Sequence, residues 1–177
     1  MKIVILDRDG VINFDSADYI KSPDEWTPIP RSLEAIADLN QAGFHVLVAT
    51  NQSGVGRGLF EMAALNAIHD KMHRALGQVG AHLDAVFYCP HAQDAGCDCR
   101  KPKPGMLREI ERRCGVYLTG VPSIGDSLRD LEASVAVGAQ PMLVLTGKGE
   151  KTRSAGGLPA GTRIFADLAE AVKAIIK

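Results

Sequence analysis

The chain has 177 residues, a formal net charge of −1 and a hydrophobic content of 46%. This length suits one compact domain with an adequate core, and the near-neutral charge gives no electrostatic reason to expect nucleic acid or an anionic membrane as a partner. The apolar runs are far too short to span a bilayer, and the acidic residue at position 7 comes too early for a signal peptide. We therefore expect a single cytoplasmic domain over residues 1–177 that is monomeric.

Short apolar runs alternate with helical patterns along the chain. The expected strands cover residues 3–6, 46–49, 85–88, 121–124, 142–145 and 163–165, and the expected helices cover 31–41, 61–76, 105–113, 128–137 and 168–176. Residues 148–161, rich in glycine, lysine and serine, are expected to form a surface loop. The alternation predicts an α/β fold, doubly wound around a mainly parallel sheet, with no large cap domain.

Polar side chains follow three of the expected strands. Asp7 and Asp9 come after the first strand, Thr50 after the second and Asp126 after the fourth. Because ligand sites in such sheets lie beyond the carboxyl ends of the strands, we expect these residues to meet at one edge. Carboxylates held close together repel each other, and a bound Mg²⁺ would relieve the repulsion. Alternatively, Asp7 and Asp9 only cap a turn or a helix.

Two histidines, His69 and His73, lie four residues apart in the helix expected over residues 61–76. They resemble the H-E-x-x-H motif of zinc proteases, but Asp70 replaces the glutamate and no third ligand follows. We interpret both as exposed histidines on the helix surface.

A cysteine-rich segment follows the third expected strand. It offers three thiolates and one imidazole, from Cys89, His91, Cys97 and Cys99. This is a closed tetrahedral ligand set for Zn²⁺ and predicts a structural zinc-binding loop, although reduced buried cysteines are the simpler alternative. Arg100 and Lys101 follow the last ligand directly, so zinc would hold the segment that carries them.

Four short motifs occur in order at the expected strand ends and in the segment after the zinc loop. They are Asp7-x-Asp9-Gly10-Val11, Thr50, Arg100-Lys101-Pro102-Lys103-Pro104 and Gly125-Asp126-x-x-x-Asp130. In this order they resemble the motifs of the haloacid-dehalogenase-like (HAD) phosphatases, over nearly the whole chain. The resemblance implies a Rossmann-like HAD fold and a Mg²⁺-dependent phosphomonoesterase.

The resemblance also implies a role for each motif residue. Asp7 would attack phosphorus and form an aspartyl-phosphate, while Asp9 would protonate the leaving group and then activate water. Thr50 and Lys101 would hold the phosphoryl oxygens, with Lys103 as the other candidate for this clamp.

For the metal, the resemblance implies a shared Mg²⁺ site at the same edge. Asp7, the backbone carbonyl of Asp9 and Asp126 would be its ligands, and Asp130 would support them without binding the ion.

The zinc segment, Cys-Pro-His followed by Cys-x-Cys-Arg-Lys-Pro, is similar to that of HAD phosphatases whose substrate is a small phosphorylated sugar. Histidinol-phosphate phosphatases share it, and a catalytically silent zinc-stapled binding module is the alternative from another class. Without a cap, short loops would select the substrate, and Arg100 and Arg57 would suit a second anionic group on it. The candidate substrate-binding residues are Asp15, Asp18, Tyr19, Asn51, Gln52, Ser53, Arg57, Arg100 and Lys103.

Overall fold

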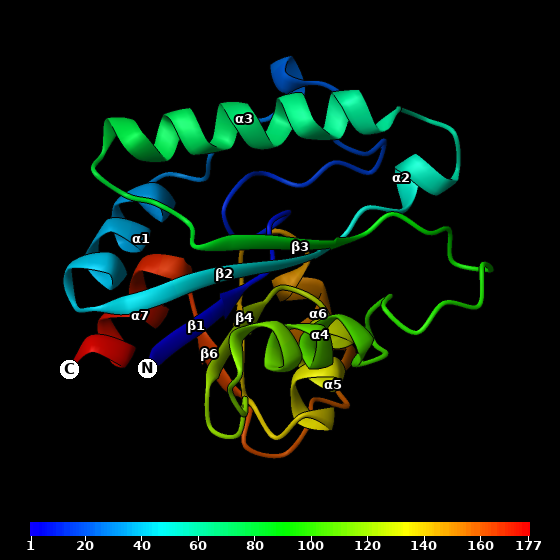
Figure 1. Ribbon diagram of the computed structural model, residues 1–177. Helices are drawn as coiled ribbons and strands as arrows, with labels where there is room; N and C mark the ends of the chain where they lie inside the picture. Colours follow the sequence, from blue (N-terminus) through cyan, green and yellow to red (C-terminus); the bar gives the residue numbers. More distant parts are fainter.

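A computed structural model describes residues 1–177 and contains one six-stranded sheet (Figure 1). The strand order is β3-β2-β1-β4-β5-β6, and every pairing between neighbours is parallel. The strands are β1 (Lys2–Leu6), β2 (Phe44–Asn51), β3 (Ala85–Cys89), β4 (Pro122–Gly125), β5 (Gln140–Val144) and β6 (Arg163–Phe165). The predicted doubly wound α/β fold is confirmed, and the order reverses direction between β1 and β4, where such sheets bind ligands.

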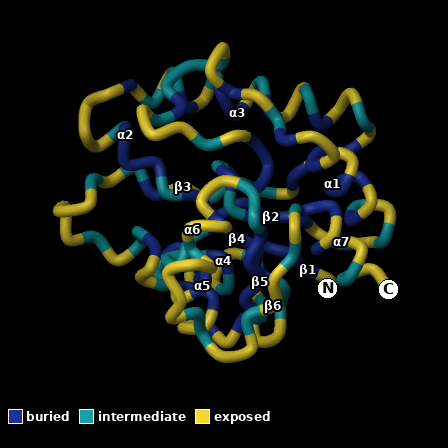
Figure 2. The backbone as a smooth tube through the Cα atoms, turned by 180° about the vertical axis from the view of Figure 1, so that it is seen from behind, coloured by how far each residue is buried: buried dark blue, intermediate teal, exposed yellow.

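Helices cover both faces of the sheet. One core packs α1 (Ser32–Gln41), α3 (Met62–Gln78) and α7 (Leu168–Ile176) on the sheet, and the other packs α4 (Gly105–Cys114) and α5 (Leu128–Ala136) on the opposite face (Figure 1). After Lys2, strand β1 is apolar because it is buried on both faces: Val4 and Leu6 belong to the first core, and Ile3 and Ile5 belong to the second. Figure 2 shows the buried residues concentrated in the central strands and the exposed residues in the connecting loops.

The start of α5 is built from residues that also belong to the candidate site. Ser127 is the N-cap, and its backbone and side chain both donate to Asp130 Oδ2, at 3.0 Å and 2.8 Å. This capping box satisfies N–H groups at the start of the helix and holds the Asp130 carboxylate in place. Helix α5 therefore fixes both its own first turn and one acidic group beside the strand ends.

Two expectations are wrong in the structure. The segment expected as a loop over residues 148–161 contains α6 (Gly149–Ala155), whose first residue packs against the carbonyl of Val144 so closely that a Cβ would lie 1.8 Å from the oxygen. His69 is buried, with 9% of its surface exposed, whereas His73 is exposed as expected. The structure also has two short helices, η1 (Pro23–Glu25) and α2 (Ser53–Gly56), and no helix is both long and apolar enough to cross a membrane.

Candidate active site and metal clusters

The carboxyl ends of β1, β2 and β4 open into a polar cavity of about 270 Å³. Asp7 follows the last residue of β1, and its backbone N–H donates to the carbonyl of Ile124 in β4 at 2.9 Å. Asp126 directly follows β4, and Thr50 lies near the end of β2. The structure therefore brings Asp7, Thr50 and Asp126 to the wall of a single cavity, from strands that are far apart in the sequence.

Three carboxylates lie together at the bottom of this cavity. Oxygen atoms of Asp7, Asp126 and Asp130 all lie within 4.8 Å of one another. Burial raises the pKa of Asp7 to about 7, with Lys101 opposing the effect and the charges of Asp130 and Asp9 adding to it. Burial, followed by the charges of Asp130 and Asp7, raises the pKa of Asp126 to about 8. A buried group of oxygen donors that repel one another without a cation is the donor set that suits Mg²⁺.

Two glycines allow the chain to close around Asp126. A Cβ on Gly10 would lie 2.0 Å from Asp126 Oδ2, and a Cβ on Gly147 would lie 2.2 Å from the same atom. Both glycines also have positive φ angles, 82° and 56°, which other residues adopt at a cost. The backbone N–H of Lys148 then donates to Asp126 Oδ2 at 2.8 Å. The orientation of this carboxylate is thus set by backbone on both sides.

Lys101 is a buried cation placed between two of the carboxylates. Its Nζ lies 3.2 Å from Asp7 Oδ1 and 2.6 Å from Asp130 Oδ1, and it donates to the carbonyl of Ala49 at 2.7 Å. Burial alone would lower the pKa of Lys101, but Asp130 and Asp7 raise it, and Lys101 in turn holds the pKa of Asp130 below its ordinary value against the effect of burial. The ammonium is therefore charged at neutral pH.

The backbone of Lys101 is held by the side chain of the last residue of β2. Asn51 accepts a hydrogen bond from the Lys101 N–H at 3.0 Å and donates to its carbonyl at 3.1 Å. Lys103, the other candidate for the clamp, points away, since its Nζ donates to the carbonyl of Cys97 at 3.0 Å and its side chain is 53% exposed. Of the two lysines, only Lys101 lines the cavity.

Asp9 receives hydrogen bonds from three side chains. Arg8 donates to both of its carboxylate oxygens, Asn13 Nδ2 donates to Oδ1 at 2.9 Å, and Gln52 Nε2 donates to Oδ2 at 3.0 Å. Burial works against ionisation, but the charge of Arg8 and these bonds lower the pKa of Asp9. Gln52 also donates to Thr50 Oγ1 at 2.9 Å, so that one amide connects Asp9 to the end of β2.

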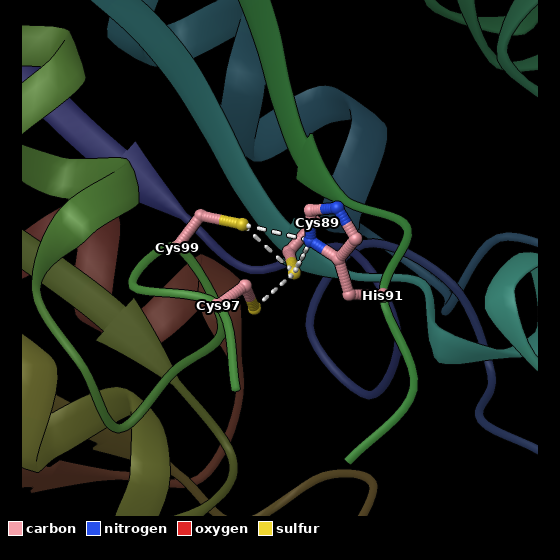
Figure 3. A group of neighbouring side chains, drawn as sticks. All are labelled: Cys89, His91, Cys97 and Cys99. Carbon is pink, nitrogen blue, oxygen red and sulfur yellow. Dashed lines mark hydrogen bonds between the residues drawn. The ribbon is translucent and has the colours of Figure 1, made fainter. Parts of the chain in front are cut away.

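The cysteine-rich segment forms a second cluster, shown in Figure 3. Ligand atoms of its four residues all lie within 4.8 Å of one another, with Cys89 Sγ at 3.5 Å from His91 Nδ1 and 3.1 Å from Cys99 Sγ. Cys97 Sγ lies 3.6 Å from Cys89 Sγ, and His91 Nδ1 lies 3.3 Å from Cys99 Sγ. Three sulfurs and one nitrogen facing a common centre are consistent with a tetrahedral zinc site without an open position.

The rim of the cavity contains several of the predicted substrate-binding residues. Asp15, Tyr19, Asn51, Gln52, Ser53 and Arg100 line it. Arg57 does not line it, but its Nη1 donates to the Tyr19 hydroxyl at 3.2 Å and to Gln93 Oε1 at 3.1 Å. Asp18 is exposed and lies outside the lining. Arg57 therefore contacts two residues of the cavity lining without lining the cavity itself, and Asp18 lies outside the lining.

Two cations on the rim were not predicted from the sequence. Arg129 belongs to α5, and Lys148 pairs with Asp15 across 3.4 Å. Arg100 has a buried Nη1 without a hydrogen-bond partner, and burial together with the charge of Arg129 lowers its pKa. Arg129 lies between Asp126 and Asp130 in the sequence, and this position was the only available signal that its side chain borders the site.

The raised pKa values predict how stability depends on pH. Because the folded-state pKa values of Asp7 and Asp126, about 7 and 8, exceed the ordinary value of 3.8, these two groups hold more protons in the metal-free folded chain than in the unfolded chain between about pH 4 and pH 8. The contribution of these two groups to stability should therefore fall as the pH rises through this range, and Mg²⁺ should offset the loss. We expect Mg²⁺ to raise the melting temperature more at pH 8 than at pH 5.5, measured by thermal unfolding. An equal rise at both pH values would contradict this explanation, and Asp126→Asn should lose the rise.

Comparisons with known proteins agree with this geometry. The chain matches a family model described as HAD-hydrolase-like over residues 98–171 and one described as polynucleotide kinase 3 phosphatase over residues 2–121. It is 59% identical over 177 residues to the D-glycero-beta-D-manno-heptose-1,7-bisphosphate 7-phosphatase of Bordetella bronchiseptica, covering 100% of this chain and 99% of the relative. It is 55% identical over 175 residues to the protein of the same name from Pseudomonas aeruginosa, covering 99% and 98%.

A solved structure has nearly the same backbone. The crystal structure of D,D-heptose 1,7-bisphosphate phosphatase from B. bronchiseptica, complexed with magnesium and phosphate, matches with a TM-score of 0.98 at 60% identity. The match covers 99% of this chain and 98% of that chain.

Proposed function

The chain belongs to the D-glycero-beta-D-manno-heptose-1,7-bisphosphate 7-phosphatase family of HAD-like hydrolases, and from this membership we propose that it removes the 7-phosphate of that heptose bisphosphate. This step would supply heptose for the lipopolysaccharide core. The observation that carries the reaction is the buried Lys101 ammonium between Asp7 and Asp130, with Asp126 beside them at the bottom of a polar cavity. We further propose that residues 1–177 act as one domain, as a monomer in the cytoplasm.

Asp7 is the proposed nucleophile. One of its carboxylate oxygens would attack phosphorus in line, forming an O–P bond while the bond from phosphorus to the sugar oxygen breaks. Lys101, already 3.2 Å from Asp7 Oδ1, would hold a phosphoryl oxygen together with the hydroxyl of Thr50. Because Lys103 lies on the surface, Lys101 is the better candidate for the clamp.

Asp9 is the proposed general acid and base. It would give its proton to the leaving sugar oxygen and then take a proton from the water that hydrolyses the aspartyl-phosphate, releasing phosphate and restoring Asp7. In the substrate-free chain, Arg8 keeps the pKa of Asp9 low. A bound phosphate dianion adds negative charge next to the carboxylate and raises its proton affinity, so that Asp9 can be protonated in the complex.

Both metals fit residues of this chain. Asp7, the Asp9 backbone carbonyl and Asp126 would hold Mg²⁺. The structure of the relative from B. bronchiseptica is a complex with magnesium and phosphate. When bound, Mg²⁺ supplies positive charge that offsets the repulsion between carboxylate and phosphate. Zn²⁺ would bind the four-residue cluster of Figure 3 and keep the following segment, with Arg100 and Lys101, in position.

Loss of the zinc cluster should weaken both folding and turnover. We expect Cys97→Ser to lose zinc, to lower the melting temperature and to reduce kcat/KM by at least about tenfold, because misplacing a catalytic group by about 1 Å can cost ~10²-fold. The measurements are metal content by atomic emission, thermal unfolding and phosphate release. Cys114→Ser is the matched control, since this half-buried cysteine lies outside the cluster. Full activity in a zinc-free Cys97→Ser protein would contradict the assigned role.

The substrate is tested by a panel of phosphoesters assayed with Mg²⁺. It contains the heptose 1,7-bisphosphate, histidinol phosphate, fructose 1,6-bisphosphate, nucleotides and a 3′-phosphorylated oligonucleotide, ranked by kcat/KM. We expect the heptose bisphosphate to rank first, because Arg100, Arg129 and Lys148 on the rim suit a second phosphate. Preference for histidinol phosphate or the oligonucleotide would overturn the substrate assignment. The assignment of the reaction as phosphomonoester hydrolysis would remain. If the protein neither hydrolyses any of these esters nor binds beryllium fluoride, the result would indicate the silent zinc-stapled module instead.

A further inference from the structure

Arg8 is a fully buried cation directly beside the proposed general acid. Its side chain is 0% exposed, although it lies between two aspartates at the end of a strand. Its Nε donates to Asp9 Oδ1 at 2.9 Å and its Nη2 donates to Asp9 Oδ2 at 3.2 Å. Since two bonds from a planar guanidinium reach both oxygens, the orientation of Arg8 determines the plane of the Asp9 carboxylate.

His69, in α3, holds the remaining end of the guanidinium. Its Nε2 lies 3.1 Å from Arg8 Nη1, and its ring lies against Tyr88 with the ring centres 6.3 Å apart. An arginine nitrogen can only donate, so Nε2 is the acceptor and the imidazole is neutral, with its proton on Nδ1. Burial, the charge of Arg8 and the neighbouring His73 lower the pKa of His69 to about 4, in agreement with a neutral ring.

The other restraints on Asp9 do not replace this contact. The side chains of Asn13 and Gln52 each donate to one oxygen of Asp9, but neither side chain hydrogen-bonds to the Arg8 guanidinium. The Arg8 guanidinium hydrogen-bonds to the side chains of Asp9 and His69 alone. Without the His69 acceptor, the buried Nη1 would lack a partner, and the guanidinium would turn toward another acceptor and take the carboxylate with it.

We propose that His69 is a positioning residue, which accepts a hydrogen bond from Arg8 and thereby keeps the Asp9 carboxylate directed into the cavity. This inference rests on the proposed function, because it takes Asp9 as the general acid and base. His69 does not line the cavity, so its influence on the reaction passes through Arg8 and Asp9. This proposal gives a function to His69, one of the two histidines in α3; neither of them takes part in the proposed chemical steps.

The leaving group distinguishes a positioning role from a merely structural one. A sugar alkoxide must be protonated as it departs, whereas p-nitrophenolate leaves without a proton from the enzyme. Because kcat/KM reports the steps up to formation of the aspartyl-phosphate, a misplaced general acid lowers it for the sugar ester and spares the aryl ester. A general loss of structure would lower both.

The test compares three variants on the heptose bisphosphate and on p-nitrophenyl phosphate. His69→Leu removes the acceptor, His69→Gln restores an acceptor oxygen near the position of Nε2, and His73→Leu is the same change on the exposed side of the same helix. We expect His69→Leu to lower kcat/KM for the sugar ester by at least about tenfold and for the aryl ester by less than about threefold. His69→Gln should recover most of the loss, and His73→Leu should match the wild type.

An equal loss on both esters, or no loss, in folded His69→Leu would overturn the proposal, and so would failure of His69→Gln to recover activity. If His69→Leu does not fold, His69→Met carries the same prediction with a more adaptable side chain. Failure of the proposed function has a different signature, because wild-type protein and His73→Leu would then cleave neither ester.

Discussion

Asp7→Asn should release phosphate at least about 10⁴-fold more slowly than the wild type, as expected when an enzyme loses its covalent nucleophile. The amide has nearly the same shape, but it cannot attack phosphorus, and it removes one charge from the metal site. The measurement is phosphate release from the heptose bisphosphate with saturating Mg²⁺. Asp38→Asn, the same change at an exposed position on α1, should retain wild-type activity.

The same variant should not be less stable at pH 8. Burial raises the pKa of Asp7 to about 7, so its charge is already disfavoured in the folded metal-free chain, and Lys101 keeps Asp130 as a partner at 2.6 Å. Inactivity without loss of melting temperature would therefore identify a chemical role. Substantial turnover by folded Asp7→Asn would contradict the assignment of the nucleophile.

Lys101→Met should remove both activity and stability. The substitution leaves the buried carboxylates of Asp7 and Asp130 without their cation, and breaking a buried ion pair by removing one partner costs about 3–5 kcal/mol. It also removes the proposed phosphoryl clamp. The measurements are urea unfolding in metal-free buffer and kcat for phosphate release.

The pH dependence of this loss follows from Asp130. In the wild type, Lys101 holds the pKa of Asp130 below its ordinary value, which adds stability above the unfolded-state pKa of about 4. Without Lys101 the pKa of this buried carboxyl should rise, so the free energy of unfolding lost at pH 8 should be partly regained at pH 5. Lys103→Met is the control and should change stability by less than about 0.5 kcal/mol, because its side chain is largely exposed. Wild-type stability of Lys101→Met at pH 8 would contradict the assigned packing.

Much of the fold could be predicted because its strands are apolar runs buried on both faces and its main helices have a clear apolar side. Helix α6 could not, since the sequence Gly-Glu-Lys-Thr-Arg-Ser-Ala has no apolar periodicity. It depends instead on tertiary contact, in which Gly149 packs closely against the carbonyl of Val144. A short polar helix of this kind is determined by its neighbours rather than by its own pattern.

The site was predictable where it depends on strand ends. Asp7, Thr50 and Asp126 follow from the rule that parallel strands direct their carboxyl ends to one edge. The burial of His69 was not predictable from the sequence. This residue flanks the apolar stripe of α3, and its partner Arg8 is 61 residues away in the chain. The stripe consists of Leu65, Ile68, Met72 and Leu76. Periodicity describes which side of a helix is apolar, but it cannot identify a polar partner from a distant part of the sequence.

The most direct measurement is chemical trapping of the phosphorylated enzyme. Wild-type protein is mixed with the heptose bisphosphate and Mg²⁺, quenched in acid during turnover and treated with borohydride, which reduces an aspartyl-phosphate to homoserine. Peptide mass spectrometry should then find homoserine at position 7, and find none in Asp7→Asn or without substrate. Homoserine in place of another aspartate, or an unmodified Asp7 in enzyme that is releasing phosphate, would contradict the assignment of Asp7 as the nucleophile.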